Sequence, residues 1–273
     1  MQIYEAISFQ KIVDSGGSTY PWRVMVVDEN KQQREFLAKM FTERQLSQQH
    51  AIAKELFGNV LAREFDLITP EAGLINFSEI FIEHQLSNDE KDKLLQKHKG
   101  LKFGCEWING MQIADPNNLK SHLKDYHLAT IFAFDNFVLN LDRGGFRNKP
   151  NLLIDDDDFL LIDHEQIFYF SDDVNASHNA VITDFKNDVW KYQAEKHLFY
   201  PSLKNLSPKA KNDIFGTFWY YLKDLNVNVL DETASFLKDN NISIGNYDLI
   251  KEYMVEIKSK PDKFCNLLMQ KIA

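Results

Sequence analysis

The sequence has few of the features that mark secreted, membrane-spanning or nucleic-acid-coating proteins. Among its 273 residues there are only two cysteines, Cys105 and Cys265, which excludes a fold held together by a disulfide framework. No stretch approaches the roughly 18 apolar residues that a membrane-spanning helix needs. Residues 1–9 lack the basic flank and the apolar core of a signal peptide. We therefore expect a cytoplasmic protein that does not contact a membrane.

Positive charge is also scarce. Lys and Arg total 31 against 40 Asp and Glu, which gives a net charge of −9 at pH 7. An acidic surface repels phosphate backbones, so direct binding of nucleic acid is not expected. The chain does have a globular composition, with 44% hydrophobic and 26% charged residues. It contains 21 Phe residues. This composition supports a large core and excludes a disordered chain.

The first part of the chain has the pattern of short strands with one longer helix. Strands are predicted for the apolar runs at residues 23–27, 34–41, 72–77 and 102–108, the first two forming a hairpin. A helix with apolar residues at i, i+4 spacing is predicted to follow an N-cap at Ser47. A capping box of Ser87 and Glu90 predicts a short second helix.

The second part has helical periodicity around one tight hairpin. A long amphipathic helix is predicted up to Val138, followed by a break at residues 140–145. Strands at residues 152–154 and 159–162 enclose an acidic tip. Further helical segments are predicted near residues 184–199, 207–224, 230–239 and 245–271, with a break at Pro261. The sequence thus predicts an α+β fold, β-rich to about residue 107 and mostly α-helical after it.

A set of polar residues around the hairpin indicates phosphoryl transfer. Asp142 lies in the loop after the long helix, Asn148 and Asn151 follow, and Asp163 ends the second hairpin strand. Phosphoryl transfer needs an aspartate that orients the attacking hydroxyl, and an Asn and an Asp that hold Mg²⁺ against the nucleotide phosphates. An Asp-Arg pair in a glycine-rich loop is also common as a simple turn, so the spacing alone leaves both interpretations open.

Residues upstream favour the same chemistry. Lys39 lies within a strand among apolar neighbours, and a buried ammonium needs a counter-charge, which Glu55 on the next helix can supply. A strand lysine paired with a helix glutamate positions nucleotide phosphates in kinases. The alternative is an edge-strand lysine that faces water. The flexible loop with Gly16, Gly17 and Ser18 can offer backbone N–H groups to phosphates.

Four stretches, in order along the chain, together resemble the HipA-like kinases in their compact form, which lacks the larger toxin's extra N-terminal domain. They are GGSTYPWRV, then REFLAKMF with AIAKELFGNVLAREFDLITPEAGLI, then FGCEW, and finally NLDRGGFRNKPNLLI with FLLIDH. The specific part of the resemblance is the combination of Asp142-Arg143, Pro150-Asn151-Leu152-Leu153 and Leu161-Ile162-Asp163-His164.

The resemblance implies a bilobal fold related to protein kinases and phosphoinositide kinases, with an N-lobe over residues 1–107 and a C-lobe over residues 108–273. It implies ATP and Mg²⁺ in the cleft, with transfer of the γ-phosphoryl group to a hydroxyl, most directly a Ser or Thr of a protein. A kinase of a small molecule or a lipid is the alternative, although the absence of a polybasic cluster argues against a membrane surface. An antitoxin-like protein partner is also implied as possible.

The resemblance implies that Lys39 contacts the nucleotide phosphates and that Glu55 is its partner on the helix. It implies that Phe103, Cys105 and Trp107 belong to the hinge that holds adenine. Asp142 would be the catalytic residue, and Asp163 would bind the metal. Cys105 is expected to be a packed thiol, because no basic neighbour in the sequence would make it a thiolate. His164 is expected to replace the phenylalanine of the kinase Asp-Phe-Gly motif. Ser171 and Ser177 lie where kinases have an activation loop, as phosphorylation sites or in a plain surface loop.

The chain departs from the family pattern at the metal site. The family usually has an Asn five residues after the catalytic Asp, where this chain has Arg147, so Asn148 and Asn151 are both candidate ligands and Asn148 is nearer the expected spacing. Glu165 replaces a small residue often found two positions after the metal-binding Asp. These departures keep open a pseudokinase that binds ATP and acts as an interaction module.

Overall fold

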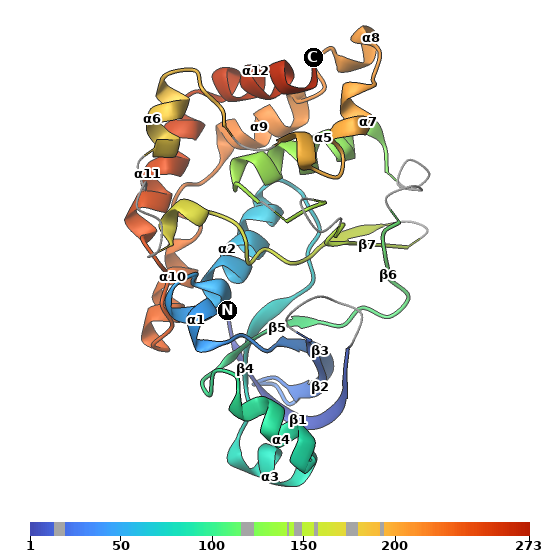
Figure 1. Cartoon of the computed structure of the whole chain (residues 1–273), viewed down its shortest axis with the longest axis vertical. Coiled ribbons are helices and arrows are strands. Elements are labelled where there is room, and N and C mark those ends of the chain that lie inside the picture. The colour runs from blue at the N-terminus through green and yellow to red at the C-terminus, as the bar shows by residue number, and fades with distance from the viewer. Residues whose placement is uncertain are drawn as a thin grey trace.

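The computed structural model describes residues 1–13, 20–115, 123–140, 142–144, 149–155, 158–172, 180–191 and 194–273 (Figure 1). The N-terminal part of the chain is rich in sheet and the C-terminal part is mostly helical, as the sequence pattern predicts. Within the described ranges, no helix has the length and apolar character needed to cross a membrane.

The N-terminal strands form one closed sheet. They are β1 (Ile3–Ile12), β2 (Trp22–Val27), β3 (Gln33–Lys39), β4 (Ala72–Asn76) and β5 (Lys102–Glu106). Neighbours pair in the order β1-β2-β3-β5-β4, and a parallel contact between β1 and β4 closes the barrel. Buried and half-buried side chains alternate along β2, so that Trp22, Val24 and Val26 share the buried face. The pairing of β2 with β3 confirms the predicted hairpin.

Helix α2 (Ala51–Glu64) lies between the barrel and the helical part, where it contacts β4, β5 and α10 (Figure 1). The predicted N-cap at Ser47 is wrong. Thr42 forms a capping box with Gln45 and starts a separate helix, α1 (Glu43–Ser47), and His50 then precedes α2 with a left-handed φ of 53°. Because the chain turns at His50, α2 can enter the space between the two parts and bury most of its surface.

The remaining elements follow in chain order. Near the barrel lie α3 (Glu79–Gln85) and α4 (Asn88–Leu95), the latter with the predicted capping box. A small sheet contains β6 (Gln112–Ile113), β7 (Leu152–Ile154) and β8 (Phe159–Leu161). The longer helices of the C-terminal part are α5 (Asp125–Phe137), α9 (Gly216–Asp224), α10 (Asp231–Asp239), α11 (Tyr247–Lys258) and α12 (Pro261–Ile272). Its shorter helical turns are η2 (Tyr169–Ser171), α6 (Ala180–Lys186), η3 (Ala194–Lys196), α7 (Tyr200–Lys204) and α8 (Pro208–Lys211).

Two predicted helices are interrupted by residues with left-handed backbone. The helix predicted at residues 184–199 is wrong beyond α6, because Asp188 has a φ of 60°. The helix predicted at residues 207–224 is divided into α8 and α9, with Asp213 at a φ of 59° between them. A left-handed residue stops the right-handed helical backbone, and apolar periodicity gives no sign of it. The break predicted at Pro261 is confirmed.

Aromatic packing holds α2 against the helical part. The ring of Phe65, at the C-terminal end of α2, stacks on Phe218 of α9 with centroids 4.9 Å apart, and it lies 5.5 Å from both Phe134 and Phe137 of α5. Offset and tilted aromatic pairs of this kind add about 0.5–1.5 kcal/mol each beyond the burial of their area. The position of α2, and of the polar residues on it, is therefore fixed by the core.

Candidate active site

A cavity of about 490 Å³ lies where the barrel, α2 and the β7–β8 hairpin meet. Its volume is in the range of pockets that enclose small ligands. Apolar side chains dominate the lining, which includes Leu37, Cys105, Trp107, Ile108, Met111, Leu153 and Leu161. Charged groups enter from Lys39, Glu55, Lys149 and Asp163. The cavity thus offers an apolar surface and a small convergent set of charges.

Lys39 joins the two halves of the cavity wall. This last residue of β3 donates from Nζ to Glu55 of α2 and to Asp163 Oδ1, the latter at 2.6 Å. The Lys39 side chain is 12% exposed, so the alternative of an edge lysine facing water is wrong. The structure therefore brings together a strand lysine, a helix glutamate and an aspartate 124 residues further along the chain.

The three groups shift one another's protonation. Burial disfavours the ammonium of Lys39, but the carboxylates of Asp163 and Glu55 outweigh burial and hold the pKa of Lys39 well above its ordinary value. Burial also opposes ionisation of Asp163, yet Lys39 lowers the pKa of that carboxyl. Burial raises the pKa of Glu55 to about 7 even beside Lys39. Lys39 and Asp163 are therefore a charged pair at neutral pH.

His164 fixes the carboxylate of Glu55 from the opposite side. Its backbone N–H donates to Glu55 Oε2 at 2.9 Å, while its buried ring packs edge-on to Phe134 with centroids 6.4 Å apart. Burial lowers the pKa of His164 to about 3, so the imidazole is neutral. The ring lies directly over Gly58 of α2, where a Cβ atom would be 2.3 Å from His164 Cβ. A packed, neutral ring is what we expect if His164 replaces the phenylalanine of the kinase Asp-Phe-Gly motif.

Asp135 organises the loop that carries Asp142. This fully buried carboxylate of α5 accepts from Arg143 Nε and from His197 Nε2, the latter at 2.9 Å, and its other oxygen accepts from Asn140 Nδ2 at 2.9 Å. Burial alone would raise the pKa of Asp135, but the charge of Arg143 and the hydrogen bond from His197 hold it at about 2. No sequence pattern pointed to His197, which lies 62 residues from Asp135.

Asp142 and Asn151 are held together in the same loop. The Asp142 N–H donates to Asn140 Oδ1 at 3.1 Å, and Asn151 Nδ2 lies 3.3 Å from Asp142 Oδ2. Arg143 Nη1 donates to the carbonyl of Asn151, whose φ is 45°. Asn151 lines the cavity, whereas Asp142 does not. Asn148 and the loop residues Gly16, Gly17 and Ser18 lie outside the described residues.

The predicted hinge residues come from β5 and the segment after it. Phe103 is the register partner of Lys39, and the Lys39 ammonium lies 5.9 Å from its ring centroid. The backbone N–H of Trp107, the residue after β5, donates to the Glu35 carbonyl of β3 at 2.8 Å. Cys105 was expected to be a packed thiol, and Lys39 by itself would lower the pKa of this thiol. Burial outweighs that effect and raises the pKa to about 12, so the thiol stays protonated.

The segment after Asp163 is attached to the start of α2. Lys54, the neighbour of Glu55, forms an ion pair with Asp172, and its side chain is only 3% exposed. Ser171 is buried and its hydroxyl donates to the Phe168 carbonyl at 2.8 Å, so neither the surface-loop interpretation nor ready phosphorylation holds for it. Ser177 lies outside the described residues.

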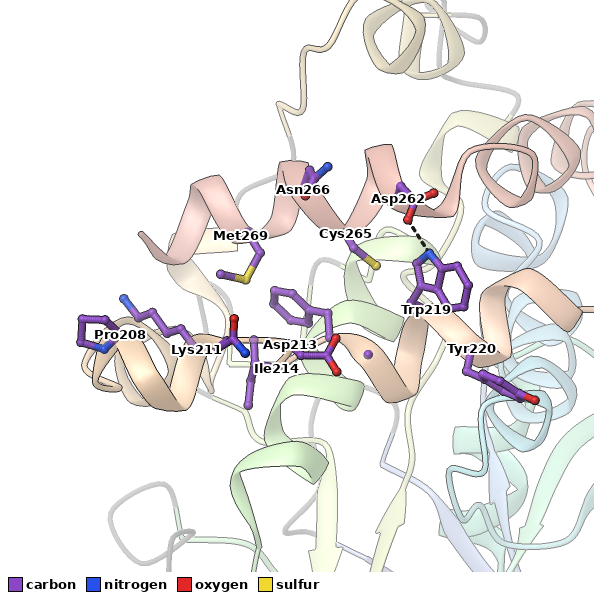
Figure 2. A pocket seen from close by; sticks show the side chains of 13 residues that line it. Pro208, Lys211, Asp213, Ile214, Trp219, Tyr220, Asp262, Cys265, Asn266 and Met269 are labelled. Carbon is purple, nitrogen blue, oxygen red and sulfur yellow. Dashed lines mark hydrogen bonds between the residues drawn. The ribbon is translucent and has the colours of Figure 1, made fainter.

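A second cavity, of about 710 Å³, lies between α9 and α12 in the helical part (Figure 2). Trp219 lines it and donates from its indole N–H to Asp262 Oδ1 at 2.9 Å. Tyr220 is 64% exposed, whereas Phe218 and Leu222 of the same helix are buried in the core. Of the residues predicted for catalysis or nucleotide binding, none that the structure describes lines this cavity.

The cavity with its lysine, glutamate and aspartate is the kind of site that kinases use, and sequence comparison agrees. The family profile described as HipA-like kinase matches residues 17–217, well over half of the chain. The chain therefore belongs to the HipA-like kinase family. Membership of this family implies ATP, a divalent metal ion and a phosphate acceptor. No curated protein matches the chain.

Comparison with solved structures gives more distant likenesses. The chain is similar to the structure titled "FAT and kinase domain of CtTel1", with 10% identity, a TM-score of 0.30 and coverage of 98% of this chain but 21% of that one. It is also similar to the complete CtTel1 dimer, with 10% identity, a TM-score of 0.29 and coverage of 98% and 11%. The chain thus spans about a fifth or less of those chains, and likeness at this level supports no statement about function.

Proposed function

We propose that the chain is an ATP- and Mg²⁺-dependent kinase with two lobes, residues 1–107 and residues 108–273, and ATP in the cleft between them. The observation that carries the proposal is Lys39, which contacts both Glu55 and Asp163 at the wall of a cavity of about 490 Å³. A lysine so held presents its charge to the phosphates of a nucleotide. The apolar lining beyond it suits the adenine ring.

The residues present fit a magnesium ion. Asp163 Oδ1 accepts from Lys39, which leaves Oδ2 for a metal, and Asn151 uses its amide nitrogen toward Asp142, which leaves its amide oxygen. Carboxylate and amide oxygens are the ligands that Mg²⁺ prefers. We therefore propose Asn151 and Asp163 as its ligands, with Asn148 as the alternative to Asn151. When bound, the ion neutralises charge on the phosphates.

Asp142 is the proposed catalytic residue. Asn151 fixes one of its oxygens, and Asp135 anchors the loop through Asn140 and Arg143. A carboxylate held in this way can orient an acceptor hydroxyl and take its proton during in-line transfer of the γ-phosphoryl group. The acceptor class, a Ser or Thr hydroxyl of a protein, and an antitoxin-like partner rest on the family resemblance alone.

The proposal is tested by separating binding from transfer. Asp142→Asn should bind ATP·Mg²⁺ with nearly unchanged affinity by calorimetry but lose phosphoryl transfer by about two orders of magnitude or more. Asp163→Asn should lose metal-dependent ATP binding. Asp158→Asn, at the exposed tip of the same hairpin, is the matched control and should behave as the wild type. Transfer retained in both Asp142→Asn and Asp163→Asn would refute the assignment, and ATP binding without any transfer in the wild type would favour the pseudokinase.

A further inference from the structure

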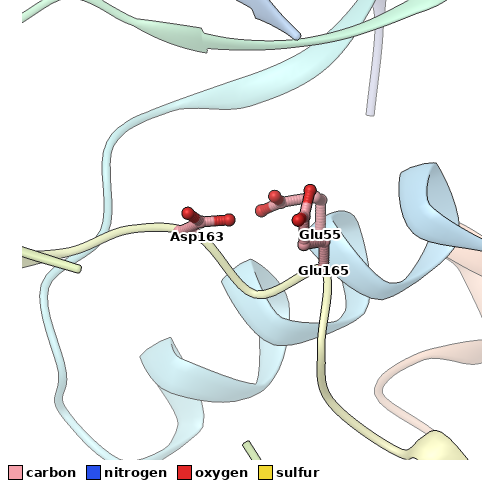
Figure 3. A group of neighbouring side chains, drawn as sticks. All are labelled: Glu55, Asp163 and Glu165. Carbon is pink, nitrogen blue, oxygen red and sulfur yellow. The ribbon is translucent and has the colours of Figure 1, made fainter. Parts of the chain in front are cut away.

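Glu165 adds a third carboxylate to the group around Lys39. The side chains of Glu55, Asp163 and Glu165 point toward one another (Figure 3), and one ligand oxygen of each lies within 4.8 Å of the others. Glu165 is also the position at which this chain departs from the small residue that is often found two places after the metal-binding Asp. The structure thus places the unusual residue of the motif beside the proposed metal ligand.

The oxygens of this group are not equally available. Glu55 Oε1 accepts from Lys39 and Glu55 Oε2 accepts from the His164 N–H, so both of its oxygens are engaged. Asp163 uses Oδ1 toward Lys39. Glu165 Oε2 is buried and has no hydrogen-bond partner among the described residues. A buried oxygen without a partner is costly, and here it lies beside another carboxylate.

The charge in this cluster is also unbalanced. Lys39 pairs with Glu55 and Asp163 but forms no ion pair with Glu165 among the described residues, so an ionised Glu165 adds negative charge that a divalent cation would offset. A cation at this point would also give the buried Oε2 of Glu165 a partner.

We propose that Glu165 is a direct ligand of the divalent cation, through Oε2 and together with Asp163. This inference rests on the proposed function and deepens it, because it assigns a carboxylate that the Asn-and-Asp metal site of a kinase does not include. Glu55 is less available as a ligand, since Lys39 and His164 already donate to its two oxygens. Two carboxylate ligands strengthen the attraction of the site for a divalent ion before any nucleotide is bound.

The test uses Mn²⁺ as the probe and contains no nucleotide. Electron paramagnetic resonance measures free Mn²⁺ during titration with the wild type, Glu165→Gln, Asp163→Asn and a control, Glu252→Gln, an exposed position on α11. We expect the affinity for Mn²⁺ to fall at least tenfold in Glu165→Gln and in Asp163→Asn, and to stay unchanged in Glu252→Gln. Because the Gln side chain removes a like charge, we also expect metal-free Glu165→Gln to melt at a higher temperature than the wild type, and to gain less from added Mn²⁺.

The outcomes separate this inference from the proposed function. Weakened Mn²⁺ binding in Asp163→Asn with wild-type affinity in Glu165→Gln would refute the role of Glu165 and leave the kinase proposal standing. Unchanged affinity in Asp163→Asn would overturn the metal site itself. If Glu165→Gln unfolds, Glu165→Asp supplies the second test. That variant keeps the carboxylate on a shorter side chain, and it should bind Mn²⁺ more weakly than the wild type and more tightly than Asp163→Asn; wild-type affinity in it would count against the role of Glu165.

Discussion

Replacing Gly58 with Ala should destabilise the protein, although the same change inside most helices is favourable. Ala exceeds Gly in helix propensity by about 1 kcal/mol. Gly58 lies within α2, however, and an added Cβ would lie 2.3 Å from His164 Cβ and 2.5 Å from His164 Cγ. A contact with Cβ cannot be relieved by rotating the imidazole, so the backbone at His164 must move.

The expected magnitude follows from these two opposing effects. Forcing an extra methyl into a packed interior costs about 1–3 kcal/mol. After the gain in helix propensity of about 1 kcal/mol, a net loss of up to about 2 kcal/mol remains. Displacement of His164 also shifts its N–H from Glu55 and moves the adjoining Asp163 relative to Lys39. We therefore expect weaker binding of ATP in Gly58→Ala as well as lower stability.

Urea denaturation checks the first effect, provided that the m-value is unchanged. A double-mutant cycle supplies the control, because His164→Gly removes the atoms that the new methyl would meet. In that background Gly58→Ala should become stabilising, by about 1 kcal/mol. If Gly58→Ala stabilises the otherwise wild-type protein, the packing of His164 on α2 is not as described and the reasoning fails.

Two further predictions concern buried charges. Asp172→Asn should lower the free energy of unfolding by about 3–5 kcal/mol, because it leaves the buried Lys54 unpaired. Lys54→Met should lower it less, because Asp172 is closer to solvent. Urea denaturation of the two variants gives the comparison, and equal losses of stability would contradict this prediction. Asp135 has a folded pKa lowered to about 2, so its contribution to stability is complete above the ordinary carboxyl range and is lost as the pH falls toward 2. Wild-type stability should therefore fall over that acidic interval more steeply than that of Asp135→Asn, as followed by denaturation at several pH values, and parallel profiles would count against the network around Arg143.

Part of the site could be predicted because its members lie on neighbouring, strongly patterned elements. Lys39 stands in an apolar strand and Glu55 on the helix that follows, so the demand for a counter-charge already suggested the pair. Asp163 follows a short hairpin whose strands were clear from their apolar runs. The approach of Asp163 to Lys39, 124 residues away, came from the order of motifs and the resemblance to kinases, since no local pattern encodes it.

Other features depended on tertiary contacts or on backbone geometry. The network of Asp135, Arg143 and His197 joins three separate segments, and its only local sign is an Asp within an apolar helix. Left-handed backbone at Asp188 ends a helix that apolar spacing would have continued. Glu165 stood out only as a departure from a motif, and its proximity to Glu55 became visible only when the chain was folded.

The most direct test of the central claim is transfer of labelled phosphate to protein. Wild type and Asp142→Asn would be incubated with a cell extract and ATP carrying ¹⁸O in its γ-phosphoryl group, and labelled phosphoserine and phosphothreonine would be identified by mass spectrometry. A kinase that uses Asp142 should produce labelled sites with the wild type that are absent with the variant. Equal labelling by the two proteins, or no labelled protein from the wild type, would contradict the account.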